Sequence, residues 1–437
     1  MSQAVLAPGF KAEPYWWEEA APTEAAATPV PAETDVVVVG GGYAGLSSAL
    51  ELARAGTSVV VLESGAFGSG ASTRNGGSIT VGINVGKNHL PVAAGAAEQF
   101  RRELITETET AYEHFEAVVA REEIACYTGR IGRYVGAHSP RAFAALARQA
   151  EELAGITGAE VELFPRARQQ DELRTDFYHG GMLVKLGGGV QPARYHHGLV
   201  RACLAQGVVL CGSARATSVT RGDGGFAIAT ARGQVRAREV VLATNGYTDA
   251  LSPWHRRRLI PVDSHMIATE QIGEERLRAM MPGLRVYGDT KRIPYYFRPS
   301  PDHTRLLFGG RASFTALDPA EAARRLYQYA LGVFPQLAGV AITHTWRGTV
   351  AFTFDYLPHM GRHEGIHYCM GCNGGGVVMM SWLGHQVALG ILGRSNRPSC
   401  FSRLPFPSRP LYGGTPWFLP IAGEYYRFRD WIERRAA

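Results

Sequence analysis

The chain lacks the features that mark several classes of protein. Its 437 residues contain only six cysteines, too few for a disulfide scaffold. Cys369 and Cys372 form one C-x-x-C pair, but no second pair stands at zinc-ligand spacing, so no metal is expected. There is no run of about 18 apolar residues, and the first residues lack the basic start and apolar core that are typical of a secretory signal. We therefore expect no membrane span and a cytoplasmic location.

Charge is also sparse and evenly spread. Asp, Glu, Lys and Arg make up 19% of the residues, and the formal net charge is +6. The densest basic run, Arg256–Arg258, is expected on a solvated loop, and no Lys/Arg block typical of nucleic-acid binding occurs. The sequence therefore predicts no nucleic-acid partner, and its basic excess favours small anionic substrates. A hydrophobic content of 46% indicates a globular chain, long enough for two or more lobes.

The most informative stretch runs from residue 34 to residue 77. It predicts a buried strand at 36–39, a helix at 46–55 and a second strand at 59–62. Three glycines stand at G-x-G-x-x-G spacing between the first strand and the helix: Gly40, Gly42 and Gly45. Glu63 follows the second strand directly. This order is typical of a dinucleotide site. The alternative is an α/β domain with a glycine-rich turn and no nucleotide.

Each part of this motif has a physical reason. Gly40 permits a tight turn, Gly42 lets the backbone approach a pyrophosphate, and Gly45 lets the helix pack close to the strand. The free N–H groups at the helix N-terminus favour the phosphate charge. Glu63 stands where an acid can accept hydrogen bonds from ribose hydroxyls.

The rest of the chain predicts further helices and strands. Helices are expected at 96–121, 139–154, 193–206 and 326–334. Short buried strands are expected at 208–210 and from residue 239, and a strand pair joined at Gly233 is expected at 226–231 and 234–238. Alternating runs at 261–269, 293–299 and 305–311 indicate an antiparallel sheet. A strand, a glycine turn and a long helix follow within 368–393.

These elements predict an α/β (α+β) fold in which a Rossmann-like nucleotide domain is interleaved with an antiparallel-sheet substrate lobe. The nucleotide domain is expected to be discontinuous, formed by residues 34–85, 186–256 and 351–400. The substrate lobe is expected at 86–185 and 257–350. Residues 1–33 form a lead-in, and residues 401–437 form an extension that packs on the body. The aromatic cluster at 15–17 is expected to pack on the body, with a partner surface as the alternative.

Five stretches together resemble the D-amino-acid-oxidase superfamily of FAD-dependent oxidoreductases, and in particular its γ-glutamylputrescine-oxidase branch. They are YWWEEAAP at 15–22, the motif at 34–77, LATNGYT at 242–248, YYFRPSPDHTRLLFGGR at 295–311, and WRGTVAFTFDYLPHMG at 346–361 with YCMGCNGGGV at 368–377. The likeness covers the chain from about residue 14 to its end. Each piece alone is weak, and the combination is specific.

The resemblance implies FAD as the cofactor. It assigns the pyrophosphate to the first glycines, the adenosine ribose to Glu63, and the flavin C2 carbonyl to the backbone N–H groups of 371–377. It also places Ser72, Arg74, Asn75 and Gly76 at the pyrophosphate and the isoalloxazine edge, and Ala216 on the adenine side. The residues implied at the cofactor are Gly40, Gly42, Tyr43, Ala44, Gly45, Glu63, Ser64, Gly70, Ala71, Ser72, Arg74, Asn75, Gly76, Gly77, Ser78, Ala216, Ala243, Thr244, Asn245, Gly348, Asp355, Gly371, Asn373, Gly374, Gly375, Gly376 and Val377. The alternatives are a flexible surface loop for 64–78 and a glycine-capped loop for 371–377.

The chain departs from the family pattern at two positions. Gly375 stands where the family often has a histidine, and Val378 stands where monomeric sarcosine oxidases have a lysine that binds the substrate carboxylate. A simple sarcosine-like substrate is therefore not expected. No Cys or His occupies a position assigned to a covalent flavin link, so the FAD is expected to be bound non-covalently.

The resemblance also implies the reaction. A small primary or secondary amine transfers hydride to flavin N5, the imine hydrolyses to an aldehyde or keto compound, and O2 yields H2O2 or another acceptor takes the electrons. The alternatives are a 2-hydroxy-acid or polyol dehydrogenase and a non-catalytic, flavin-binding electron-transfer subunit. The candidate substrate residues are Tyr296, Arg298, His265, Arg311, Trp346 and Arg347. The recurring arginines favour a substrate with a carboxylate, phosphonate or sulfonate.

Overall fold

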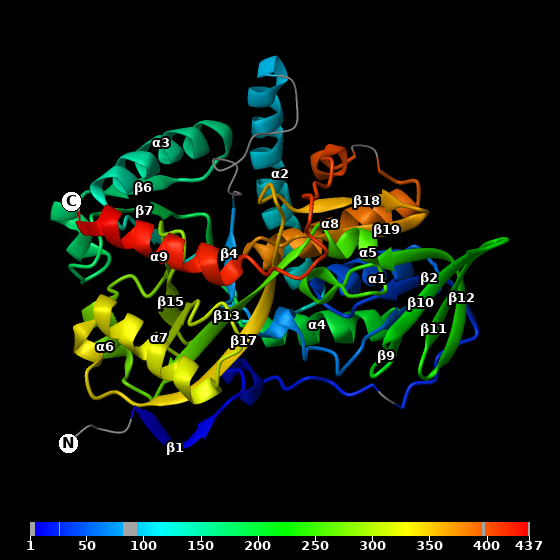
Figure 1. Cartoon of the computed structure of the whole chain (residues 1–437), viewed down its shortest axis with the longest axis horizontal. Helices are drawn as coiled ribbons and strands as arrows, with labels where there is room; N and C mark the ends of the chain where they lie inside the picture. The colour runs from blue at the N-terminus through cyan, green and yellow to red at the C-terminus, as the bar shows by residue number, and fades with distance from the viewer. Residues whose placement is uncertain (1–4, 26, 82–93, 396–397, 436–437) are drawn as a thin grey trace.

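Two large β-sheets organise the molecule, as Figure 1 shows. The computed structural model describes residues 5–25, 27–81, 94–395 and 398–435. The expected domain boundary at residues 85 and 86 lies outside the described residues. The mixed α/β fold class is confirmed.

The first sheet has a parallel core that begins with the predicted motif. Its strands are β2 (Glu33–Val39), β3 (Val59–Leu62), β9 (Val209–Cys211), β12 (Gly233–Leu242) and β19 (Ile366–Met370). They lie side by side in the order β9-β3-β2-β12-β19. Antiparallel strands complete the sheet: β10 (Ala216–Gly222) and β11 (Gly225–Thr230) extend β12, and β18 (His359–His363) pairs with β19.

Both faces of this parallel core are buried, which explains its continuous runs of β-branched residues. Val36 and Val38 pack on one face against helices, whereas Val37 and Val39 pack on the other against strands that include β11. The helices on the first face are α1 (Tyr43–Arg54), α2 (Ala94–Arg121), α4 (Pro192–Ala205) and α8 (Gly376–Ile391).

The second sheet is mostly antiparallel and has nine strands. Their order is β1 (Leu6–Lys11), β17 (Ile342–Phe352), β13 (Ile260–Thr269), β16 (Leu306–Gly310), β15 (Tyr296–Pro299), β14 (Val286–Asp289), β5 (Arg133–Gly136), β7 (Gly181–Val184) and β6 (Val161–Phe164). Helices α6 (Glu274–Met280) and α7 (Pro319–Val333) cover one face. The other face packs on η1 (Tyr15–Glu18) and on α3 (Pro140–Ile156).

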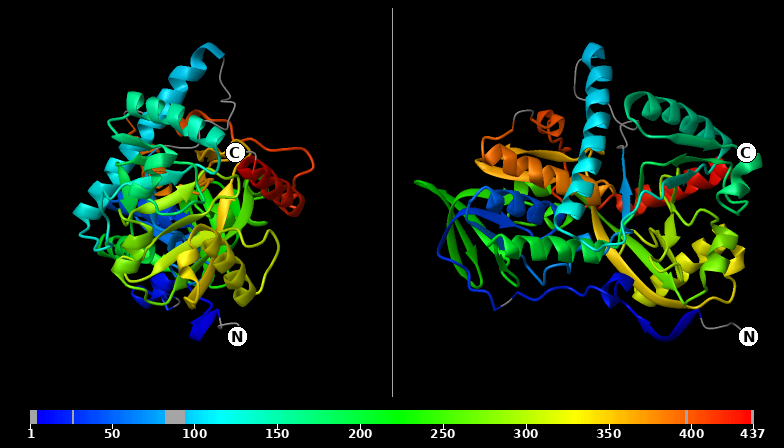
Figure 2. Two further views of the ribbon diagram at one scale, coloured as in Figure 1. Left: turned by 90° about the vertical axis from the view of Figure 1, so that its left-hand side faces the viewer. Right: turned by 180° about the vertical axis from the view of Figure 1, so that it is seen from behind.

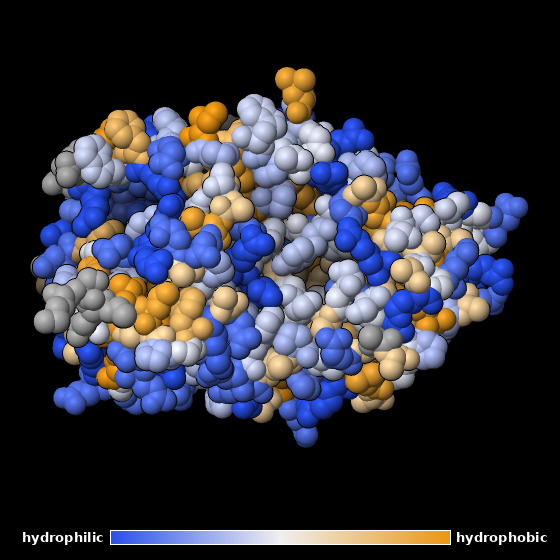
Figure 3. All heavy atoms as spheres, turned by 60° about the horizontal axis from the view of Figure 1, so that its bottom comes forward, coloured by the Kyte–Doolittle hydropathy of each residue, from blue (hydrophilic) through white to orange (hydrophobic). Residues whose placement is uncertain are grey.

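Short elements join these layers. They are η2 (Ala71–Thr73), β4 (Ser78–Thr80), η4 (Arg166–Asp171), β8 (Gly187–Gly189), η5 (Asn245–Tyr247), α5 (Pro253–Arg256), η6 (Pro335–Leu337) and η7 (Cys400–Arg403). The last helix, α9 (Leu419–Arg435), lies along the lobe of the second sheet (Figures 1 and 2). The face in Figure 3 carries mainly hydrophilic side chains broken by small apolar patches. No helix in the described parts of the chain is long and apolar enough to cross a membrane.

Three expectations differ from the structure. No sequence pattern predicted β17, an 11-residue strand, or the strands between 133 and 184. Helix α7 starts seven residues earlier than the expected 326, because the Asp318 carboxylate accepts hydrogen bonds from the N–H groups of Ala320 and Glu321. The run at 293–299 becomes a strand only at residue 296, since the Ile293 N–H binds Asp430 and not a neighbouring strand.

Candidate active site

The turn between β2 and α1 has the geometry that the glycine spacing predicts. Gly40 adopts a φ of 109°, which side-chain-bearing residues rarely adopt. A Cβ on Gly45 would lie 1.9 Å from the Gly40 carbonyl oxygen, and a Cβ on Gly42 would lie 2.9 Å from Ser72 Oγ. The helix can therefore begin this close to the strand only because position 45 has no side chain.

Glu63 closes this turn from the side of β3. Its carboxylate accepts hydrogen bonds from the N–H groups of Gly41 at 2.8 Å and Gly65 at 3.1 Å. The N–H of Ala214 donates to the Glu63 carbonyl at 2.7 Å. Ala216, the proposed adenine-side residue, is buried two residues further along. The acid, the glycine turn and this segment thus lie together.

The polar segment at 68–78 is fixed by specific contacts. Ser72 Oγ accepts a hydrogen bond from the Tyr43 N–H at 3.2 Å. Asn75 Nδ2 donates to the Ser72 carbonyl at 2.9 Å, and Arg74 Nε donates to the Ser69 carbonyl at 2.8 Å. The Arg74 guanidinium lies 4.6 Å from the ring centroid of Trp17. The segment is therefore held against the N-terminus of α1 and against η1.

Two tryptophans from distant parts of the chain support the same segment. Trp16 Nε1 donates to the Asn75 carbonyl and Trp346 Nε1 donates to the Arg74 carbonyl, each at 2.9 Å. Their rings meet edge to face, with centroids 6.3 Å apart. Trp16 is 1% exposed, so the aromatic cluster at 15–17 packs on the body. In the structure Trp346 holds the proposed cofactor segment, and it was expected to line the substrate pocket.

The third glycine turn joins β19 to α8. Asn245 Oδ1 accepts a hydrogen bond from the Gly371 N–H, and Asn373 Oδ1 accepts one from the Thr353 N–H, each at 3.0 Å. Both asparagines have positive φ, 44° and 45°, in the region that asparagine tolerates better than most residues. The turn that leads into α8 therefore lies beside the end of β12.

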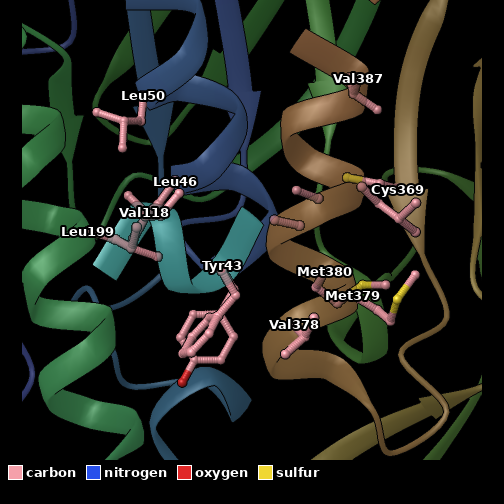
Figure 4. Packing of buried hydrophobic residues seen from close by; sticks show 14 of the residues in the cluster. Tyr43, Leu46, Leu50, Val118, Leu199, Cys369, Val378, Met379, Met380 and Val387 are labelled. Atoms are coloured by element: carbon pink, nitrogen blue, oxygen red, sulfur yellow. The ribbon is translucent and has the colours of Figure 1, made fainter. Parts of the chain in front are cut away.

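Helices α1 and α8 lie side by side in the same direction, with Tyr43 and Val378 near one end (Figure 4). Their close approach depends on Gly384, where a Cβ would lie 2.1 Å from the Ala44 carbonyl oxygen. Two helix N-termini therefore point the same way, and the first N–H groups of each have no carbonyl partner within their own helix. Such a pair can serve the two distant polar parts of a long dinucleotide.

The other proposed cofactor residues are placed as follows. Ser64 Oγ donates to the Glu63 carboxylate at 3.0 Å. Gly70, Ala71, Gly76, Gly77 and Ser78 belong to the fixed segment, Ala243 and Thr244 follow β12, Gly374 and Gly375 precede α8, and Gly376 and Val377 begin it. Ser78 Oγ is buried without a partner among the described residues. A Cβ on Gly348 would lie 3.0 Å from Arg74 Cβ. Asp355 supports the neighbouring turn, because its carboxylate binds His359 Nε2 at 3.0 Å.

Tyr296 links the second sheet to the cofactor segment. Its ring lies over Gly309, where a Cβ would come within 2.1 Å of the ring, and beside Gly76, where a Cβ would lie 3.1 Å away. Its hydroxyl is 2.9 Å from Ser264 Oγ. Burial raises the pKa of the Tyr296 phenol. The phenol is therefore neutral at physiological pH and next to the site proposed for the flavin.

Two arginines on this face differ in their partners. Arg298 Nη1 donates to the carbonyls of Gly77 and Val190, each at 2.9 Å, and its Nε donates to the Pro299 carbonyl at 3.1 Å. Arg311 has a buried Nε without a partner among the described residues, and its guanidinium lies 5.0 Å from the Phe352 ring centroid. Burial lowers the pKa of Arg298 to about 10 and also lowers that of Arg311. Of these two arginines, Arg311 is therefore the one with a buried nitrogen for which a ligand could supply the acceptor.

His265 and Arg347 lie on the opposite face of the second sheet. Met266 packs with Tyr296 on the face toward the first sheet, whereas Ile267 packs toward α7. Because side chains alternate along a strand, His265 shares the face of Ile267. Arg347 is directly across from His265 and pairs with Asp263 at 3.2 Å. The sequence predicted that these two residues would line the substrate pocket together with Tyr296 and Arg311. The structure instead places them on the other face of the sheet.

One contributor was missed. His196, on α4, is 2% exposed, and its Nε2 donates to the Gly41 carbonyl at 2.7 Å. Burial lowers the pKa of His196 to about 4. The neutral ring thus supports the first glycine turn from behind. No sequence signal could have identified it, since a histidine within an amphipathic helix is usually exposed.

The residues fit an FAD. The glycine cradle needs positions without side chains, Glu63 closes the ribose side, and two helix N-termini are available for anionic groups. Together with the second sheet, these features define a flavin-dependent oxidoreductase. Residues 35–389 match the family described as FAD dependent oxidoreductase, and the chain belongs to that family. The expectations of the family, the FAD cofactor and an oxidoreductase are confirmed.

Known relatives agree with this assignment. The chain is 32% identical to γ-glutamylputrescine oxidoreductase from Escherichia coli, over 91% of this chain and 92% of that protein. It is 28% identical to a probable oxidoreductase, OrdL, from Rhizobium meliloti, over 98% of this chain and 99% of that protein. Glycine oxidase from Bacillus cereus superposes with a TM-score of 0.67, at 18% identity over 86% of this chain and 99% of that chain.

Proposed function

We propose that the enzyme oxidises the C–N bond of a small primary or secondary amine that carries an anionic group. The observation that supports the anionic group most strongly is the Nε of Arg311, which is buried without a partner among the described residues, on the sheet face that also carries Tyr296. The flavin, when bound, accepts the hydride from the carbon next to the amine nitrogen.

A buried guanidinium atom without an acceptor is costly. A carboxylate, phosphonate or sulfonate could accept from Nε and a terminal nitrogen together, in the bidentate geometry that suits arginine. Phe352 covers the guanidinium and reduces its contact with water. Arg311 therefore binds the anionic group of the substrate and fixes the distance from that group to the amine.

Tyr296 positions the other end of the substrate. Its hydroxyl is held by Ser264, and its ring contacts Gly76 in the segment proposed to touch the flavin. The amine binds deprotonated, so no side chain has to remove a proton before hydride transfer. The imine then hydrolyses to an aldehyde or keto product, and O2 takes up the electrons as H2O2. The E. coli relative is named for γ-glutamylputrescine, an amine with a distant carboxylate, which agrees with this arrangement.

A 2-hydroxy-acid or polyol dehydrogenase is less well supported. Such a reaction usually needs a positioned base, commonly a histidine. His265, the one histidine among the candidate substrate residues, lies on the opposite face of the sheet. The remaining alternative, an electron-transfer subunit without a substrate, does not explain why the Arg311 Nε is buried without a partner in the part of the chain that the structure describes.

An anaerobic screen tests the proposal. The flavin absorbance is followed while matched pairs of amines are added: a γ-glutamyl-amine against the same diamine without the glutamyl group, and an aminoalkyl phosphonate against its uncharged analogue. We expect the anionic member of a pair to bleach the flavin, and admission of air to form H2O2. Bleaching by hydroxy acids alone would support the dehydrogenase, and bleaching by no compound would support the electron-transfer subunit.

A further inference from the structure

The last helix, α9, has its polar side against the protein. Asp430 accepts hydrogen bonds from the N–H groups of Arg292 at 3.1 Å and Ile293 at 3.2 Å. Arg427 Nη2 donates to the Arg311 carbonyl at 3.2 Å. Glu433 pairs with Arg292 at 2.7 Å. The helix is thus attached to the second sheet by hydrogen bonds and ion pairs and not by an apolar face.

The opposite side of α9 is apolar and exposed. Ile421, Tyr425, Phe428 and Ile432 are 74%, 53%, 56% and 39% exposed. Their spacing of four, three and four residues places them on one face of the helix. Trp417, just before the helix, is 65% exposed, and Leu411 is 94% exposed. A surface helix normally packs its apolar face against the protein and exposes its polar face. The exposed apolar face of α9 therefore indicates contact with another surface.

The surroundings of this apolar face are basic. Residues 401–437 contain six arginines and three acidic residues. Nearby, Arg256 binds Thr415, Arg257 binds the Pro253 carbonyl, and Arg409 binds the Ser408 carbonyl. None of these three arginines has a carboxylate partner among the described residues. An anionic surface would therefore complement the region around α9.

The position of this segment allows contact with a flat surface. In the left view of Figure 2, α9 and the orange-red loop before it form the outer edge of one side of the molecule. Leu411 and Trp417 on the loop and Ile421 and Phe428 on the helix are exposed together. Tryptophan and tyrosine favour the boundary between lipid headgroups and acyl chains, because each combines an apolar ring with a polar atom.

We propose that α9 and the loop at 409–417 bind in the plane of an anionic lipid surface. The apolar face of α9 enters the headgroup boundary, and the arginines of the region contact lipid phosphates. A second copy of the chain fits less well, because a two-fold interface would bring the same basic region of both copies together. The proposal does not depend on the substrate of the enzyme.

Vesicle co-sedimentation of the FAD-loaded full chain tests this. We expect binding to vesicles that contain phosphatidylglycerol, weak binding to pure phosphatidylcholine, and weaker binding at high salt. The double variant Ile421→Ser with Phe428→Ser should bind at least about tenfold less, since two apolar side chains no longer enter the lipid. Leu204→Ser is the matched control, because Leu204 is 56% exposed on α4, away from this face, and it should bind as the unchanged protein does.

Flavin absorbance and amine oxidation should be the same in all three proteins, which shows that the variants are folded. The proposal is overturned if the unchanged protein does not bind anionic vesicles, or if the double variant binds them equally well. It is also overturned if light scattering shows a dimer that the double variant dissociates while vesicles are not bound. In that case a second copy covers the face.

Discussion

The cofactor cradle and the substrate face of the second sheet are built in different ways. The cradle depends on backbone groups and on the absence of side chains: a Cβ on Gly45 would lie 1.9 Å from a carbonyl oxygen. The substrate face depends on individual side chains, and two arginines there have opposite roles. Arg298 donates to carbonyls, whereas Arg311 has a buried nitrogen with no partner within the described ranges. A site built from backbone groups can be predicted from the spacing of glycines in the sequence. For a site built from side chains, the sequence indicates only which residues could take part.

The largest effect is expected in the cradle. Gly45→Ala forces a methyl group against the Gly40 backbone, which cannot move without separating β2 from α1. We expect a loss of about 4 kcal/mol or more in the free energy of unfolding, with little bound FAD. Thermal melting and flavin absorbance measure both effects. Gly390→Ala in α8 is the control, because a Cβ there meets nothing within 4 Å, and it should be neutral or slightly stabilising.

The second effect concerns binding of the anionic group. Arg311→Met should keep the fold and the flavin but lower kcat/KM for the anionic amine by about 10²- to 10³-fold, and much less for the uncharged analogue. Steady-state kinetics on the matched pair measures this difference. Arg347→Met, on the opposite face, is the control and should leave the discrimination unchanged. Equal losses on both amines would show that Arg311 does not bind the anionic group.

The third effect separates the two arginines. Arg298→Met removes the donors for the Gly77 and Val190 carbonyls, so we expect the free energy of unfolding to fall by about 2 to 3 kcal/mol. Discrimination between the paired amines should change little. Urea unfolding and the same kinetic comparison measure both quantities. If Arg298→Met abolished the discrimination as Arg311→Met does, the distinction between the two arginines would be wrong.

The sequence predicted the first glycine turn well because its requirements are local. The spacing of Gly40, Gly42 and Gly45, with strands on either side and Glu63 after the second, leaves few other structures. By contrast, Tyr296 and Arg298 could be placed on one face by alternation, but nothing in the sequence showed that Arg298 would meet carbonyls from residues 77 and 190. Those contacts join segments that are far apart in the chain.

The residues that were misplaced failed for the same reason. His265 and Arg347 resembled pocket residues, but their face depends on the register of β13 and β17, and β17 itself was not predicted. The contacts of Trp16 and Trp346 with the segment at 74–75 depend on how η1 packs against the second sheet. A one-residue change of register would have reversed which side chains face the flavin.

The smallest effect is a change of stability with pH at the cradle. The folded pKa of His196, about 4, is below its value in the unfolded chain, about 6.5. Its stabilising contribution is therefore complete above about pH 6.5 and is lost as the pH falls toward 4, because only the unfolded chain takes up the proton. Between about pH 7 and about pH 5.5 this amounts to about 1 kcal/mol.

His196→Gln can still donate to the Gly41 carbonyl but does not titrate. Urea unfolding at both pH values should show a drop for the unchanged protein that exceeds the drop for the variant by this amount, which other buried histidines cannot produce because they are the same in both proteins. Equal drops would show that His196 does not remain neutral behind the glycine turn.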